Sequence, residues 1–146
     1  MYKRPARVLF LEAGDGSRAR LAQALAPRAA GGWITPLAAS LRSGRPDTRL
    51  ARVAAARGVA VDLRPCAGLE TGLAEGCDLV VALGLEGEVV RSRLGASPRP
   101  VKAWPLVEGA VAPAGPADLR RLGDHLEARL RGMAGGLRLL ARSGGG

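Results

Sequence analysis

The sequence predicts an α/β fold: a single domain with a doubly wound sheet of about four parallel strands and helices on both faces. Three observations support this prediction. Apolar runs of strand length alternate with segments of helical periodicity along the 146 residues. The run 78–83 (DLVVAL) is continuously apolar after one acid, as expected for a parallel strand buried on both faces. The segment 8–25 passes from an apolar run through two glycines into a helical pattern.

The first half of the chain supplies two strands separated by a helix. Residues 7–11 form the first strand, and 17 to about 30 form the first helix, which Gly31 ends. Residues 33–39 are predicted to be extended. Pro36 favours an edge position for this second strand, because proline cannot donate a hydrogen bond to a neighbouring strand.

The second half continues the alternation. We expect, in order, a helix at 46–57, a short extended piece at 59–61, a helix at 69–75, strands at 78–83 and 100–104 with a helix at 85–94 between them, and a last helix from Pro116. Leucines at three-and-four spacing give this last helix an apolar stripe. The domain is expected to span 1–142, followed by a disordered tail at 143–146.

The composition narrows the class of partner. The formal charge of +9 points to acidic partners, but the arginines that carry it are spread along the chain. Four aromatic residues are too few for a platform on which bases stack, so specific nucleic-acid binding is not expected. No apolar run is long enough to span a membrane, and we expect a cytoplasmic protein. The composition leaves the oligomeric state open.

The sequence offers no set of metal ligands. Cys66 and Cys77 lack the spacing of a metal site, and His125 is the single histidine that could join them. Neither a metal nor another cofactor is therefore expected. Both cysteines are interpreted as small packing residues.

The segment Ala13-Gly14-Asp15-Gly16-Ser17-Arg18 has the features of an anion-binding loop. A strand that turns through glycines into a helix leaves free backbone N–H groups at the positive end of the helix dipole. Asp15 or Ser17 is available to cap the helix.

Two known loop types fit this segment poorly. A Walker A loop is excluded, because no Gly-Lys-Ser/Thr follows. A Rossmann-like nucleotide loop has the spacing of Gly14, Gly16 and Ala19. That mode also needs an acid after the second strand to hold the ribose, and the chain has no Asp or Glu between Asp15 and Asp47. A nucleotide binder is kept as an alternative.

Four segments match a third pattern in serial order. Residues 11–24 correspond to V-C-x-G-N-x-C-R-S-x-x-A-E-A, residues 38–40 to a Ser-Ala-Gly turn, residues 78–81 to a D-L-V-V strand, and residues 104–109 to W-P-x-x-D-P. By this agreement, which covers most of its length, the chain resembles the low-molecular-weight protein tyrosine phosphatases and the thioredoxin-coupled arsenate reductases. The resemblance implies their α/β fold and a phosphate-binding loop at 13–18.

The departures from this family bear on chemistry. The resemblance places Glu12 where the family has its nucleophilic cysteine, while Arg18 matches the arginine that clamps the anion. Ala19 replaces the serine that supports the thiolate, and Asp15 replaces an asparagine. Glu108 falls at the position of the general acid. The resolving cysteines of the arsenate reductases follow the D-L-V-V strand, where this chain has none.

These departures predict a catalytically inactive phosphatase-like domain. A carboxylate is a poor nucleophile towards a phosphate dianion and repels it. We expect Glu12 to face Arg18 and to fill, from within the chain, the place where the family holds phosphate. The domain would then bind an anion, a phosphorylated ligand or a protein partner. The alternative is an active phosphatase or arsenate reductase-like enzyme with a non-standard site at Glu12, Arg18 and Glu108.

Overall fold

The computed structural model describes residues 4–74, 76–95, 99–106 and 115–144. Four strands form one parallel sheet: β1 (Ala6–Glu12), β2 (Ile34–Ser40), β3 (Leu79–Leu83) and β4 (Val101–Trp104). The helices are α1 (Ser17–Ala30), the short 3-10 helix η1 (Gly31–Trp33), α2 (Leu50–Ala56), α3 (Leu69–Ala74), α4 (Gly87–Leu94) and α5 (Pro116–Gly144).

The strand order is β2-β1-β3-β4, and every pairing is parallel. The chain therefore adds β2 on one side of β1 and then crosses back to place β3 on the other side. The predicted edge position of the strand that holds Pro36 is confirmed. In such sheets ligands bind beyond the carboxyl ends of the strands, where the order reverses, and the loop that follows β1 lies there.

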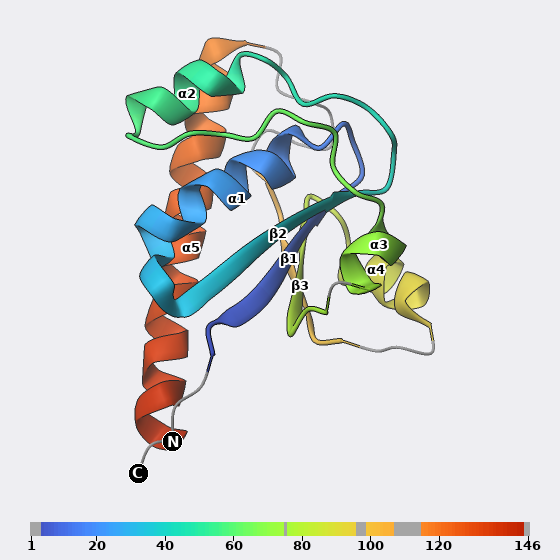
Figure 1. Ribbon diagram of the computed structural model, residues 1–146, viewed down its shortest axis with the longest axis vertical. Coiled ribbons are helices and arrows are strands. Elements are labelled where there is room, and N and C mark those ends of the chain that lie inside the picture. Colours follow the sequence, from blue (N-terminus) through green and yellow to red (C-terminus); the bar gives the residue numbers. More distant parts are fainter. Residues whose placement is uncertain (1–3, 75, 96–98, 107–114, 145–146) are drawn as a thin grey trace.

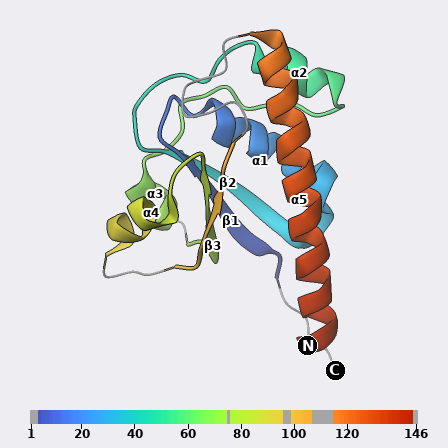
Figure 2. The same ribbon diagram turned by 180° about the vertical axis from the view of Figure 1, so that it is seen from behind.

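Helices cover both faces of the sheet, as predicted (Figure 1). On one face Val8 and Phe10 of β1 pack in a core with α1 and α5, and Phe10 also contacts the Trp104 ring at a centroid distance of 5.9 Å. On the other face Leu9 and Leu11 pack against α3 and α4. The view from behind shows α5 running past α1 along the whole domain (Figure 2).

One acid ties together the amino ends of two central strands. The Asp78 carboxylate accepts a hydrogen bond from the Arg7 backbone N–H at 2.8 Å and pairs with the Arg4 guanidinium at 2.7 Å. Arg4 and the hydrogen bond from Arg7 lower the pKa of Asp78 below its ordinary value. The acid before the apolar run thus fixes the start of β3 next to β1.

Two boundaries differ from the sequence-based prediction. The helix expected at 46–57 begins only at Leu50, because the Asp47 N–H donates to Ser17 Oγ at 2.8 Å and the Asp47 carboxylate pairs with Arg49. The last helix runs through the Gly135–Gly136 pair to Gly144, two residues into the expected tail at 143–146. Residues 145–146 lie outside the described part of the chain.

No helix in the described part of the chain combines the length and apolar character needed to cross a membrane.

Candidate anion-binding loop

The loop 13–18 joins the carboxyl end of β1 to the first turn of α1, at the point where the strand order reverses. Its neighbours hold it closely. The Leu41 N–H donates to the Glu12 carbonyl at 2.9 Å, and a Cβ on Gly44 would lie 3.3 Å from the Asp15 Cα. The segment after β2 therefore passes directly over the loop, and glycine at position 44 permits that approach.

Strand alternation directs the Glu12 side chain towards α1. Residues of a strand point to opposite faces in turn, so Glu12 lies on the same face as Val8 and Phe10. Its Oε1 accepts a hydrogen bond from the Ala19 backbone N–H at 3.0 Å, and its side chain is only 1% exposed. Ala19 is the third residue of α1, and the first N–H groups of a helix have no acceptor within the helix. The Glu12 carboxylate fills this vacancy.

Arg18 faces the same carboxylate. Its Nη1 lies 3.8 Å from Glu12 Oε2, and both side chains are buried. The predicted Glu12–Arg18 contact is present as an ion pair, at a separation longer than a hydrogen bond. The carboxylate thus has the helix N-terminus on one oxygen and the guanidinium near the other.

Opposing effects act on the pKa of Glu12. Burial raises the pKa above its ordinary value of 4.5, and this effect is the largest. The hydrogen bond from the Ala19 N–H, the Arg18 charge and a hydrogen bond from the Arg18 N–H lower it, while the Asp15 charge raises it. Desolvation outweighs the other effects, so the pKa of Glu12 is raised overall.

The space beside Glu12 is narrow. A Cβ on Gly14 would lie 3.1 Å from Glu12 Oε2, closer than ordinary van der Waals contact. The backbone of the turn at Gly14 therefore packs directly against the Glu12 carboxylate. Asp15 adds a second negative charge close to the Glu12 carboxylate.

Of the two residues that we considered as caps of α1, one accepts a hydrogen bond from the first turn. The N-cap position is Gly16, whose φ of +95° lies in the left-handed region. The Asp15 Oδ1 accepts the Ser17 N–H at 2.9 Å, so Asp15 does the capping. Ser17 as the cap was wrong, because its hydroxyl instead accepts the Asp47 N–H.

Cys66 lies against the loop, which its position in the sequence did not suggest. Its Sγ donates to the Gly16 carbonyl at 3.8 Å, and a Cβ on Gly16 would come within 2.8 Å of that sulfur. Burial raises the pKa of the Cys66 thiol from 9.0 to about 11. The thiol is therefore protonated at neutral pH and is a weak nucleophile. Cys77 belongs to the core on the opposite face of the sheet.

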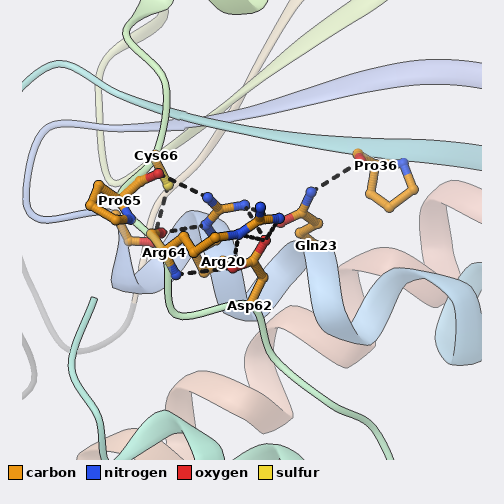
Figure 3. Close-up of polar contacts among 8 residues, drawn as sticks. Arg20, Gln23, Pro36, Asp62, Arg64, Pro65 and Cys66 are labelled. Atoms are coloured by element: carbon orange, nitrogen blue, oxygen red, sulfur yellow. Dashed lines mark hydrogen bonds and ion pairs between the residues drawn. The ribbon is translucent and has the colours of Figure 1, made fainter. Parts of the chain in front are cut away.

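Arg20 is a structural residue that the sequence analysis missed. From α1 its Nε and Nη2 donate to the carbonyls of Arg64 and Pro65 at 3.0 and 2.9 Å. Its Nη1 lies 3.4 Å from the Asp62 carboxylate (Figure 3). Arg20 thereby fixes the segment 62–66 and places Cys66 over the loop. Its burial is known only from the structure, and no signal in the sequence identified it.

Glu108, the expected general acid, lies outside the described residues. Among the described residues, no group of three or more His, Cys, Asp or Glu side chains could hold a metal ion.

Comparisons with known proteins support the fold. No family model and no curated protein matches the chain. Among solved structures, an arsenate reductase from Archaeoglobus fulgidus has 22% identity and a TM-score of 0.66, covering 88% of this chain and 98% of its own. The YwlE arginine phosphatase from Geobacillus stearothermophilus has 17% identity and a TM-score of 0.72, with 95% and 97% covered. A low-molecular-weight protein tyrosine phosphatase from Bacillus subtilis has 21% identity and a TM-score of 0.70, with 90% and 97% covered.

These structures match over nearly their whole lengths as well as over nearly all of this chain. The four-stranded parallel sheet and its helices agree with the expectation from sequence. The chain has the fold of the low-molecular-weight protein tyrosine phosphatases and arsenate reductases.

Proposed function

We propose that this protein is a catalytically inactive, phosphatase-like domain that acts by binding a protein partner. The observation that carries the proposal is the position of the Glu12 carboxylate. It accepts a hydrogen bond from the Ala19 N–H and lies beside the Arg18 guanidinium. The groups that would bind phosphate in such a loop therefore interact with a side chain of the protein instead. A bound phosphate would have to displace it.

The chemistry of the loop also argues against turnover. A buried carboxylate is a weaker nucleophile than a thiolate, and Glu12 and Asp15 together repel an incoming phosphate dianion. Cys66 does not replace the missing thiolate, because its thiol donates to the Gly16 carbonyl and its pKa is raised to about 11.

Hydrolysis of p-nitrophenyl phosphate tests this proposal. The wild type should be inactive at neutral pH. A triple variant, Glu12→Cys/Asp15→Asn/Ala19→Ser, reverses the three departures in the loop and should gain measurable activity. Adding Arg18→Met should abolish that activity, because the arginine clamps the anion. Hydrolysis by the wild type that is lost in Arg18→Met alone would show an enzyme and contradict the proposal.

A further inference from the structure

A groove lies between α2 and the first turns of α5. It is open to solvent and has a volume of about 850 Å³. The residues that define this α2–α5 groove include Arg49, Arg52, Val53, Pro116, Leu119 and Arg120.

The groove combines an apolar floor with basic edges. Val53 is half-buried and Leu119 is buried, and both belong to or pack against the core that fills the α1 face of the sheet. Arg52 and Arg120 are exposed and come from facing helices. None of the described residues that line this groove is an acid.

Two arginines at the groove, Arg52 and Arg120, differ from several others in the fold in their lack of an acidic partner among the described residues. Arg57, close by, uses its guanidinium on Asp124 and Glu127 at 2.8 and 3.0 Å. Among the described residues, the side chains of Arg52 and Arg120 have no acidic partner within ion-pair distance. Two positive charges therefore flank an apolar surface, and no acid of the described part of the chain pairs with either of them.

We propose that the α2–α5 groove binds an acidic, amphipathic peptide segment of a protein partner. An apolar side chain of the partner would lie on Val53 and Pro116, above the buried Leu119, and carboxylates beside it would pair with Arg52 and Arg120. This inference rests on the proposed binding role of the domain and names the surface and the partner chemistry.

The apolar floor favours a peptide over a nucleic acid. A phosphate backbone would pair with the arginines but would leave the apolar surface uncovered. The aromatic side chains on which bases stack are also scarce, at 3% of the chain, and none lines the groove.

The structure also connects the groove to the loop. The Asp47 N–H, just before α2, donates to Ser17 Oγ in the loop, while the Asp47 carboxylate pairs with Arg49 at the groove edge. A partner in the groove would therefore lie close to the loop that follows β1.

Selection from a random peptide phage library, with the full chain as bait, tests the inference. Enriched peptides should carry Asp or Glu beside apolar residues. In fluorescence anisotropy, Arg52→Glu/Arg120→Glu should weaken their binding at least about tenfold, because like charges then face each other. Arg93→Glu/Arg129→Glu changes the net charge equally at two exposed residues outside the groove and should change binding less than about twofold. Arg52→Ser/Arg120→Ser removes the same two charges without adding negative ones and should also weaken binding. Circular dichroism checks that each variant is folded.

Several results would overturn the inference. These are the absence of enriched peptides, enrichment of peptides without acids, equal weakening by both double variants, or displacement of the peptide by duplex DNA at matched ionic strength. Enriched peptides that ignore the groove substitutions would reject the groove but leave the binding role intact. Hydrolysis of p-nitrophenyl phosphate that depends on Arg18 would instead reject the proposed function.

Discussion

The Glu12 carboxylate accepts a 3.0 Å hydrogen bond from the backbone N–H of Ala19, seven residues further along the chain. This bond closes the turn between β1 and α1 on itself. In an anion-binding loop, a backbone N–H at the helix N-terminus donates to the bound ligand. Here this N–H donates to a buried side chain of the protein itself. The loop and the segments packed against it lead to three predictions about stability and one about binding.

The stability of the wild type should depend on the protonation of Glu12. Because burial raises the pKa of Glu12 above 4.5, the folded state binds this proton more tightly than the unfolded state. Relative to the non-titrating variant Glu12→Gln, the wild type should lose stability as the pH rises above about 4.5, by at most about 1.4 kcal/mol per pH unit. The loss should stop once the pH passes the folded-state pKa.

Urea unfolding of both proteins between pH 4 and 8 measures this difference. A wild-type stability that rises relative to Glu12→Gln over the same interval would mean that Arg18 and the backbone donors outweigh desolvation. The pKa of Glu12 would then be lowered, contrary to our interpretation.

The contact between Gly16 and Cys66 should appear as coupling between two substitutions. Gly16→Ala forces an alanine into φ +95° and brings its Cβ to 2.8 Å from the Cys66 Sγ. We expect a loss of about 3 kcal/mol, of which about 1–2 kcal/mol is backbone strain and the rest is the clash. In a Cys66→Ala background the clash disappears, so Gly16→Ala should destabilise by only the smaller amount.

Chemical denaturation of the two single variants and the double variant closes this thermodynamic cycle. An effect of Gly16→Ala that is identical with and without the Cys66 sulfur would show that the two residues do not touch in solution.

Arg20 should contribute much more to stability than an exposed arginine. Arg20→Met keeps the apolar stem but removes the donors to the Arg64 and Pro65 carbonyls and the ion pair with Asp62. We expect a loss of about 2 kcal/mol in the free energy of unfolding. Arg93→Met, at an exposed position of α4, serves as the matched control and should change stability by less than about 0.5 kcal/mol. Equal effects of the two substitutions would contradict the role assigned to Arg20.

The sequence predicted those features that follow from periodicity and local order. Apolar runs located the four strands, because strands buried in a sheet need apolar side chains. Pro36 indicated the edge strand, because proline lacks the N–H that would donate to a neighbouring strand. The spacing of Glu12 and Arg18 around a glycine turn also predicted their contact, since the strand–turn–helix geometry is local.

Long-range contacts were not predictable in the same way. Arg20 is one of many arginines, and nothing in its spacing distinguishes it from an exposed helix residue until segment 62–66 is placed beside α1. Cys66 likewise reaches the loop only through the crossover that follows α2. The late start of α2 reflects the hydroxyl of Ser17, thirty residues earlier, which takes the N–H of Asp47.

Phosphate binding measured by isothermal titration calorimetry tests the central claim most directly. If Glu12 occupies the loop, titration of the wild type with phosphate at neutral pH should give no detectable heat of binding. Glu12→Ala should then bind with measurable affinity that Arg18→Met removes. Phosphate binding by the wild type as tight as that by Glu12→Ala would contradict the claim, because the loop would then be open with its carboxylate in place.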